Sequence, residues 1–483
     1  MLFNSLRFIV FFPAVAVLYF ALPHRVRWML LLAASYYFYM CWKAEYILLI
    51  VASTLVDYAA GLLMGRSQSP GARKLVLAMS LASNLGLLFA FKYFNFFSDS
   101  TRAVLQQFNV FYDTPTFHLL LPVGISFYTF QTLSYSIDVY RGNKTPERHL
   151  GIFAVYVAFF PQLVAGPIER SERLLPQFLE RHRLDWARVG DGLSLMLWGF
   201  FKKIVIADRL AVYVNEVFNH PGAYEGAPVW LAAYFFSFQI YCDFSGYSDI
   251  AIGSARVMGF DLMDNFRRPY FARNIADFWQ RWHISLSTWF RDYVYIPLGG
   301  SRVSVPRWTI NVLVVFVVSG LWHGAAWTFV IWGALHGFYY MVSRWTAEFR
   351  ARFNATAGLD ALPNVQGALR VFITFNLVTL AYIFFRANSL GDAITLIGSL
   401  FHSAAGSQAV RVILTPADFW IAIAAVAALL FLEGLIAREP RAEGRAPFAG
   451  RPIGLRAGFA YGMLMGLLVF GWFVQSPFIY FQF

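Results

Sequence analysis

The stretch VLVVFVVSGLWHGAAWTFVIWGAL, residues 312–335, carries a single ionisable side chain, His323, inside a long and mostly apolar run. Such runs are typical of helices that cross a lipid bilayer, because about 20 apolar residues span its hydrocarbon core. An ionisable group at this depth is unfavourable, and where one occurs it usually marks a pathway or a site. The stretch therefore predicts a membrane environment and a candidate functional residue together.

Similar apolar runs recur along the whole chain, whose 483 residues are 58% hydrophobic and only 14% charged. The candidate spans are 6–22, 28–42, 46–64, 75–97, 117–139, 150–168, 190–214, 228–255, 309–325, 326–343, 368–385, 417–437 and 457–474. They leave no room for a soluble domain, so we predict an all-α, polytopic membrane protein with one domain over residues 1–483. The first run lacks a small-residue cleavage site and is interpreted as a retained span rather than a signal peptide.

The formal net charge of +12 comes largely from short basic loops between the spans. This pattern is typical of cytoplasmic loops and argues against a nucleic-acid ligand. One conflict arises, because the basic loops 140–149 and 169–188 flank a single apolar run. Proline and glycine interrupt that run, so we interpret residues 150–168 as re-entrant, which places the carboxy terminus outside the cytoplasm.

The residue inventory excludes several kinds of chemistry. Cys41 and Cys242 lie in apolar runs and form no CxxC pair, so neither a disulfide framework nor a thiolate metal site is indicated, and no metal is expected. The chain also lacks the short motifs of serine hydrolases, P-loop NTPases, zinc proteases and dinucleotide-binding enzymes. Acid/base chemistry by histidine remains, because a neutral imidazole can take a proton from a hydroxyl at cytoplasmic pH.

The longest polar interval, residues 256–307, is unusually aromatic. Within IADFWQRWHISLSTWFRDYVYI (275–296), Phe278, Trp282, Trp289 and Tyr293 recur at roughly helical spacing, with charged residues between them. The composition favours an anchor helix at the cytoplasmic interface, where Trp and Tyr are common. The presence of His283 in this segment favours a site instead.

His323 and His336 receive different interpretations. The neighbouring Gly320 and Gly324 let another backbone or a ligand approach His323 closely. We interpret His336 as a packing residue bonded to a backbone carbonyl. Thirteen residues at the helical rotation turn it away from the face of His323.

Five stretches resemble the membrane-bound O-acyltransferase family, and among its members the bacterial ones that acetylate exopolysaccharides such as alginate. They are LPVGISFYTFQTLSYSIDVYRG (121–142), YCDFSGYSDIAIG (241–253), FWQRWHISLSTWFRDYVYIPLGGSR (278–302), GLWHGAAWTFVIWGALHG (320–337) and SPFIYFQF (476–483). The resemblance implies a ring of tilted helices around a central tunnel, with re-entrant and interfacial helices. It also implies acyl transfer from a cytoplasmic thioester to a hydroxyl at or across the membrane.

The resemblance places the family's invariant histidine at His323 and its second position, forty residues earlier, at His283. That second position is often Asn in the family, so the role of His283 stays open between a second base, an orienting residue and an oxyanion donor. Our working hypothesis makes His323 the general base and lets His283 steady the oxyanion. The segment 267–302 would receive acyl-CoA, whose phosphates suit arginine. Candidate donor-binding or tunnel residues are Trp282, Arg281, Trp289, Arg291, Trp322 and Asp243.

The tail, residues 475–483, is rich in aromatic side chains and includes the hydroxyl of Tyr480. An interfacial aromatic belt explains it on general grounds. The resemblance adds a second interpretation, in which Tyr480 carries an acyl group from CoA to an outside partner.

Several charged residues lie at membrane depth. Asp243 and Asp249 are explained equally well by packing hydrogen bonds and by a role in the substrate path. Lys202 and Lys203, with Asp208, are interpreted as a charged cluster at a cytoplasmic helix end.

The resulting hypothesis is a bacterial inner-membrane subunit that moves acetyl from acetyl-CoA, with no further cofactor, to an exported polysaccharide. The acceptor is reached directly or through a separately encoded extracytoplasmic acetyltransferase or esterase-like partner. Peptidoglycan O-acetylation and D-alanyl transfer to teichoic acid are alternatives with the same fold. A secondary transporter is the alternative of another class.

Overall fold

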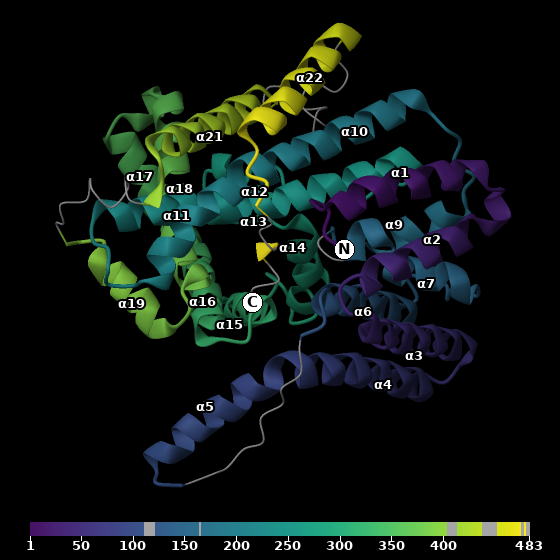
Figure 1. The fold of residues 1–483 in the computed structure, drawn as a ribbon. Helices are drawn as coiled ribbons and strands as arrows, with labels where there is room; N and C mark the ends of the chain where they lie inside the picture. The colour runs from purple at the N-terminus through teal and green to yellow at the C-terminus, as the bar shows by residue number, and fades with distance from the viewer. Residues whose placement is uncertain (111–120, 164–165, 403–412, 437–451, 475–477, 480–483) are drawn as a thin grey trace. The chain divides into compact units, whose positions relative to one another are not determined.

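A computed structural model describes residues 1–110, 121–163, 166–402, 413–436, 452–474 and 478–479 of the chain (Figure 1). Every regular element in these ranges is helical, which agrees with the predicted fold class. The chain divides into two compact units, residues 1–193 with 251–263, and residues 194–250 with 264–483. We call them the first and second units.

The helices of the first unit are α1 Leu6–Ala21, α2 His24–Met40, η1 Ala44–Tyr46, α3 Ile47–Arg66, α4 Pro70–Leu88, η2 Phe89–Tyr93, α5 Phe94–Gln107, α6 Ile125–Arg141, α7 Leu150–Ala158, α8 Phe160–Leu163 and α9 Ser171–Leu179, with the beginning of α10 Trp186–Phe200 and the end of α12 Ala227–Met258. The second unit holds the rest of α10 and α12, with η3 Phe201–Ala207, α11 Asp208–Asn219, η4 Pro269–Phe271, α13 Ile275–Arg281, α14 Ile284–Phe290, η5 Arg291–Tyr295, α15 Val305–His323, α16 Trp327–Trp345, α17 Ala347–Thr356, η6 Leu359–Ala361, α18 Pro363–Arg386, α19 Leu390–Ser399, α21 Pro416–Ile436 and α22 Ile453–Phe470.

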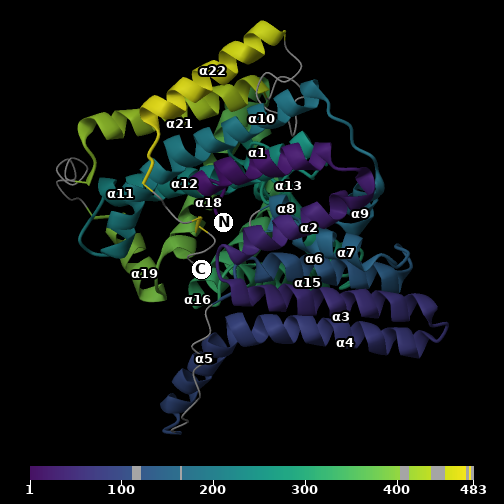
Figure 2. The ribbon, with the colours of Figure 1, turned by 45° about the vertical axis from the view of Figure 1, so that its right-hand side comes forward.

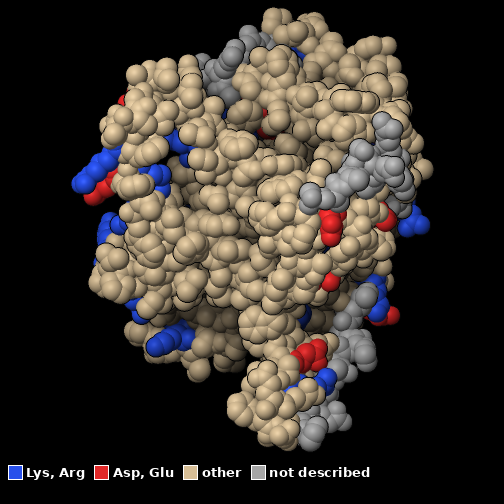
Figure 3. Space-filling model, turned by 90° about the vertical axis from the view of Figure 1, so that its left-hand side faces the viewer, with Lys and Arg blue, Asp and Glu red and all other residues tan. Residues whose placement is uncertain are grey.

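Six helical segments of the described chain are long and apolar enough to cross a membrane. They are Ala44–Arg66, Pro70–Gln107, Val305–His323, Pro363–Arg386, Pro416–Leu435 and Ile453–Phe470. Figure 3 shows one face of the protein on which uncharged side chains predominate and charged groups are isolated. Such a surface is expected where lipid tails, not water, are the solvent.

The re-entrant interpretation of residues 150–168 agrees with the helix lengths. Helix α7 has nine residues and is followed by a break at Phe159 and the four-residue α8. Nine helical residues rise about 14 Å, roughly half of the hydrocarbon thickness. Helix α7 therefore cannot cross the bilayer alone.

In the first unit, α3, α4 and α6 run side by side (Figure 2). They enclose the buried carboxylate of Asp57. Asp57 accepts hydrogen bonds from Ser80 Oγ at 2.6 Å, Ser136 Oγ at 2.7 Å and Asn84 Nδ2 at 2.8 Å. Ser80 and Asn84 lie one turn apart on α4, and Ser136 lies on α6. The carboxylate of Asp57, on α3, therefore ties the three helices together.

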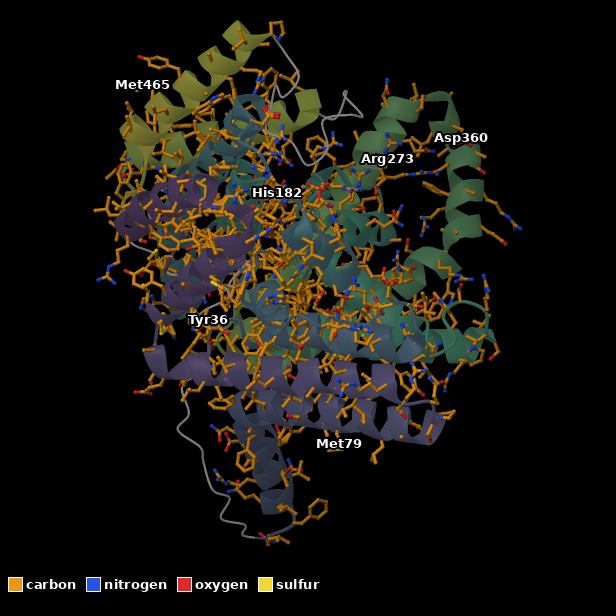
Figure 4. The ribbon with its side chains drawn as sticks, turned by 90° about the vertical axis from the view of Figure 1, so that its right-hand side faces the viewer. Tyr36, Met79, His182, Arg273, Asp360 and Met465 are labelled. Atoms are coloured by element: carbon orange, nitrogen blue, oxygen red, sulfur yellow. The ribbon has the colours of Figure 1, made fainter. Side chains whose placement is uncertain are left out.

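The loop after α9 also packs within the first unit. His182, labelled in Figure 4, has its ring 4.8 Å from that of Phe260. Gly259 has φ +106°, and a Cβ there would lie 2.7 Å from His182 Cγ. Both the backbone angle and the contact require glycine at this turn.

In the second unit, α15 and α16 lie side by side and approach each other at two glycines (Figure 1). A Cβ on Gly320 would lie 2.2 Å from the carbonyl oxygen of Phe329, and one on Gly333 would lie 2.2 Å from that of Phe316. The close approach that the sequence predicted beside His323 is confirmed, and the approaching group is the backbone of α16.

We expect Gly333→Ala to lower the stability of the protein by about 1–3 kcal/mol, because its methyl group would force α15 and α16 apart. Gly434→Ala is the matched control, since a Cβ at Gly434 in α21 meets nothing within 4 Å. It should be neutral or slightly stabilising. Thermal unfolding of both variants in the same detergent makes the comparison, and equal midpoints would refute the close-packing argument.

Candidate active site

His323 is the last residue of α15 and is almost fully buried. The helix ends because Gly324 adopts an extended backbone, and α16 restarts at Trp327. The imidazole ring centre lies 5.0 Å from both Trp322 and Trp332 and 5.5 Å from Phe385. Aromatic side chains thus surround His323, and the break in the chain places it at a helix end rather than inside a continuous span.

His283 lies between the short helices α13 and α14 in a left-handed conformation, with φ +45° and ψ +53°. For a residue other than glycine this conformation is uncommon and costs of order 1–3 kcal/mol. It persists because the next peptide is held, the N–H of Ile284 donating to the carbonyl of Asn265 at 2.9 Å. Backbone strain of this kind is concentrated at functional sites.

The two histidines come together in the second unit. Their ring centres are 6.1 Å apart, and His283 also lies 5.9 Å from Trp322 and 4.7 Å from Phe244. The two imidazoles are therefore close neighbours, although they come from positions forty residues apart in the chain.

Hydrogen bonds position the His283 ring. Its Nδ1 lies 3.1 Å from Oδ1 of Asn265, which also accepts from the Ser285 hydroxyl at 2.9 Å. Burial lowers the pKa of His283 to about 3. The imidazole is therefore neutral at cytoplasmic pH.

The left-handed residue corrects one expectation. The helical spacing of Phe278, Trp282, Trp289 and Tyr293 predicted a continuous helix, but the chain breaks at His283 into α13 and α14. Trp282 is 1% exposed, and its ring packs against Phe266 at 5.0 Å and Phe278 at 5.5 Å. It therefore supports the His283 turn from within the unit.

The other candidates of this segment lie in local contacts. Arg281 pairs with Asp277 at 2.6 Å and Arg291 with Asp292 at 2.7 Å. The ring of the buried Trp289 lies edge-on to Phe290 and tilted against Tyr293. Arg273, labelled in Figure 4, is exposed. Its Nη2 would lie 3.8 Å from a Cβ atom built on Gly367 of α18, so the guanidinium passes close to that helix. Among the six donor or tunnel candidates, Trp322 contacts both histidines, at 5.9 Å from His283 and 5.0 Å from His323.

Asp243 belongs to a buried ion network beside the site. Helices α10 and α12 cross at Gly199 and Gly246, where a Cβ on either would lie within 2.7 Å of the other's carbonyl oxygen. The crossing brings Lys203 Nζ to 2.7 Å from Asp243 Oδ1 and 2.8 Å from Asp208 Oδ1. Asp243 directly precedes Phe244, whose ring packs against His283. Phe244 therefore connects the ion network to the site.

The prediction that Lys202 and Lys203 lie at a cytoplasmic helix end is wrong. Both are almost fully buried in η3, a π-helical segment inside the run from α10 to α11 rather than at a helix end. Lys202 pairs with Asp249 at 2.5 Å. Pairing with carboxylates of α12 makes this burial possible, and hydrophobic periodicity along one helix cannot reveal partners on another.

The tail reaches the same network. The N–H of Ile479 donates to Asp243 Oδ2 at 2.7 Å, and the ring of Phe478 lies 5.7 Å from Phe244. Both tail residues are buried. Tyr480 itself lies outside the described residues.

His336 is buried as predicted, but its hydrogen-bond partner differs from the prediction. Its Nδ1 lies 3.3 Å from the indole N–H of Trp279, not from a backbone carbonyl. His323 and His336 both have ring centres 5.0 Å from Trp332. The rotation argument assumed one continuous helix, whereas α15 ends at His323 and α16 begins at Trp327.

Sequence reasoning missed Asn265, which contacts His283 Nδ1, and also Ser248 and Ser285, which hydrogen-bond to Asn265. Asn265 lies 18 residues before His283 in the chain and carried no signal of spacing or motif that would single it out. No group of three or more metal-ligating side chains occurs in the part of the chain that the structure describes, and both cysteines are free.

Comparison with known proteins agrees with this architecture. The sequence profile of the membrane-bound O-acyltransferase family matches residues 149–384, which contain both histidines. The chain is 42% identical to the probable alginate O-acetylase AlgI of Pseudomonas putida, over 83% of this chain and 80% of that protein. It is 41% identical to AlgI of Pseudomonas aeruginosa over 83% of this chain and 75% of that one. Identity to a peptidoglycan O-acetyltransferase of Helicobacter pylori is 37%, over 82% and 79%. The chain is therefore a multi-pass membrane acyltransferase and belongs to the membrane-bound O-acyltransferase family.

Proposed function

We propose that this protein transfers acetyl from cytoplasmic acetyl-CoA to hydroxyls of an exported polysaccharide. The observation that carries the proposal is the pair of buried histidines, 6.1 Å apart, one at the end of a membrane helix and one in a strained turn. Identity of about 40% to alginate O-acetylases over most of the chain supports the acetyl donor and the polysaccharide acceptor.

The reaction divides into tasks that two imidazoles can share. The acceptor hydroxyl attacks the thioester carbonyl, its proton passes to a histidine, and the carbonyl oxygen becomes an oxyanion. The second imidazole donates a hydrogen bond to that oxyanion. Collapse of the intermediate forms the ester and breaks the C–S bond, and the CoA thiolate takes up the proton. No further cofactor is needed.

Several details of the proposal come from the sequence. The protein resides in a bacterial inner membrane with its carboxy terminus outside the cytoplasm, and a tunnel between the two sides lets acetyl cross without CoA. Acyl-CoA binds from the cytoplasm near segment 267–302. The polymer is reached directly or through a separate extracytoplasmic acetyltransferase or esterase-like protein.

The alternative acceptor favoured by a specific observation is peptidoglycan, because a peptidoglycan O-acetyltransferase is 37% identical over 82% of the chain. D-Alanyl transfer to teichoic acid requires a different acyl group on the donor. The transporter alternative is dropped, since the chain belongs to an acyltransferase family.

We also propose that Tyr480 relays the acyl group. Its neighbour Ile479 is hydrogen-bonded to Asp243, and Phe478 contacts Phe244, which in turn contacts His283. These contacts of the two preceding tail residues support the relay. The phenol oxygen would attack the thioester carbonyl while a histidine takes its proton, and the C–S bond would break as the CoA thiolate leaves and takes up that proton. The acceptor hydroxyl would then attack the phenyl ester, and its proton would pass to the phenolate that leaves.

The test is release of CoA from acetyl-CoA by the purified protein in lipid, with and without polysaccharide. Acetyl-CoA should turn over or leave a labelled protein, whereas D-alanyl thioesters of a carrier should not. Absence of CoA release and of label with acetyl-CoA, in the presence of candidate partners, would contradict the acetyl donor.

Radiolabelled acetyl-CoA extends the same experiment to the tail. We expect the label on wild-type protein to map to Tyr480 and to disappear in Tyr480→Phe, which keeps the ring and removes only the hydroxyl. Full polymer acetylation by Tyr480→Phe would eliminate the relay and leave direct transfer.

A further inference from the structure

The last described residues of the tail, Phe478 and Ile479, are bound inside the second unit. Phe478 is 0% exposed and Ile479 is 1% exposed. The backbone N–H of Ile479 donates to Asp243 Oδ2 at 2.7 Å. The ring of Phe478 lies 4.4 Å from that of Tyr247 and 5.7 Å from that of Phe244. One hydrogen bond and two ring contacts, all with residues of α12, therefore hold this part of the tail.

The hydrogen bond at Ile479 recognises the backbone of the tail rather than a side chain. A backbone N–H can only donate, and a carboxylate is a stronger acceptor for it than a neutral oxygen. A carboxylate buried among membrane helices needs a cation, which Lys203 Nζ supplies to Asp243 Oδ1 at 2.7 Å. Asp243 thus turns one oxygen to the lysine and the other to the tail.

Lys203 is itself fixed from two sides. Its Nζ lies 2.8 Å from Asp208 Oδ1 and 5.6 Å from the centre of the Tyr247 ring, on which Phe478 packs. The carboxylate that binds the tail and the ring that packs against it therefore face the same ammonium group.

The segment that carries Lys203 also holds the chain on the other side of residues 475–477. The next residue of η3, Ile204, accepts a hydrogen bond at its carbonyl oxygen from the N–H of Trp472 at 3.0 Å. The π-helical η3 therefore contacts the chain directly at Trp472 and, through Lys203 and Asp243, at Ile479. Segments of π-helix within α-helices occur frequently at functional sites.

Stability alone does not explain a buried ion pair at this place. Replacing a complete buried ion pair with apolar residues is often neutral or stabilising. Asp243 supplies what an apolar side chain cannot, an acceptor at a defined position. That position adjoins the site, because Phe244 follows Asp243 and has its ring 4.7 Å from that of His283.

We propose that Asp243, oriented by Lys203, is a positioning residue that docks the backbone of the tail at Ile479 and so restricts the reach of Tyr480. Consecutive Cα atoms lie about 3.8 Å apart, so a fixed Ile479 limits the volume that the next side chain can search. Holding a reacting group near its partner lowers the entropic cost of attack. The positioning role rests on the proposed function, because it serves the relay through Tyr480.

Asp243→Asn removes the acceptor for the tail with almost no change of shape. The amide has one oxygen, and the Lys203 ammonium can only donate, so the oxygen turns to Lys203. The NH₂ group then faces the N–H of Ile479, and two donors form no hydrogen bond. Asp208→Asn is the matched control, because it removes the same charge from the same lysine at an equally buried side chain, 3% exposed against 4% for Asp243.

Ile479→Pro removes the same hydrogen bond from the side of the tail. Proline has no backbone N–H, and the substitution leaves the buried ion network intact. Its control is Ile479→Val, which keeps the N–H and a β-branched apolar side chain. This pair tests the dock even if Asp243→Asn fails to fold.

Hydrogen exchange of backbone amides, measured by mass spectrometry of overlapping C-terminal peptides, tests the dock in lipid without substrate. We expect the Ile479 amide to be protected in the wild type and in Asp208→Asn, and to exchange about 10- to 100-fold faster in Asp243→Asn. Equal protection in all three proteins would overturn the dock. Equal loss in both variants would also overturn it, because that pattern means a general loosening of the network.

Labelling of Tyr480 by radiolabelled acetyl-CoA tests the consequence. Asp243→Asn and Ile479→Pro should each lower the labelling rate at saturating acetyl-CoA about 10- to 100-fold, whereas Asp208→Asn and Ile479→Val should stay within a few-fold of the wild type. The KM for acetyl-CoA should change little, because the dock acts on the tyrosine and not on the donor.

The two measurements separate the dock from the relay. Labelling at the wild-type rate by Ile479→Pro, or by a folded Asp243→Asn, would overturn the positioning role. A wild type that takes up no label, although its Ile479 amide exchanges as expected, would instead count against the proposed relay alone.

Discussion

His323→Phe is expected to lower the rate of CoA release by about 10² to 10⁴-fold, whether His323 acts as base or as oxyanion donor. A phenyl ring can neither accept a proton nor donate a hydrogen bond. It still fits the space, because the imidazole packs among Trp322, Trp332 and Phe385. The loss should appear in kcat, and the unfolding temperature should change little.

His336→Phe is the matched control for His323→Phe, because it also replaces a buried imidazole with a phenyl ring in the pair formed by α15 and α16. His336 is fully buried and packs against Trp332 as His323 does, but it lies outside the pair formed with His283. Its loss leaves the Trp279 N–H without its acceptor, which should lower stability by about 1–3 kcal/mol and change the rate only a few-fold. Equal losses of activity in the two variants would show that ring packing, not chemistry at His323, controls turnover.

The second large effect is expected for Lys203→Met, which should destabilise the protein by about 3–5 kcal/mol. Lys203 is the cation between Asp208 and Asp243, and all three side chains are at most 4% exposed. Removing it leaves two carboxylates buried beside each other. Intrinsic fluorescence of the tryptophans during heating measures the unfolding midpoint.

Two further variants separate charge from volume. Lys203→Met combined with Asp208→Asn and Asp243→Asn carries no unpaired charge and should recover much of the lost stability. Lys43→Met removes a lysine that pairs with Glu45 at 3.4 Å in an exposed position, and should change stability by less than about 1 kcal/mol. A midpoint for Lys203→Met as high as that of Lys43→Met would disprove the role of the network.

Long apolar runs predicted the membrane class and most of the long helices correctly. The runs at 309–325 and 326–343 correspond to α15 and α16, and the run at 75–97 lies within the continuous helical stretch 70–107. Such predictions succeed because a membrane helix satisfies its backbone hydrogen bonds internally, so its signal is local in the sequence.

The site was predictable only in part. A histidine in an apolar run is visible to any reader of the sequence, and the family resemblance connects it to a second histidine forty residues earlier. Asn265 was not predictable, because an asparagine in a polar loop is unremarkable until its amide is found against His283. The burial of Lys203 was missed for the same reason, since its carboxylate partners include one from another helix.

The sequence by itself determined the membrane environment, the family and the identity of both histidines, because these depend on local composition and on motifs. Only the tertiary structure decided that the two rings lie 6.1 Å apart, that His283 occupies a left-handed turn, and that Asn265 faces its Nδ1. Hydrogen bonds between residues distant in the chain position the imidazole ring, and a local pattern in the sequence cannot reveal them.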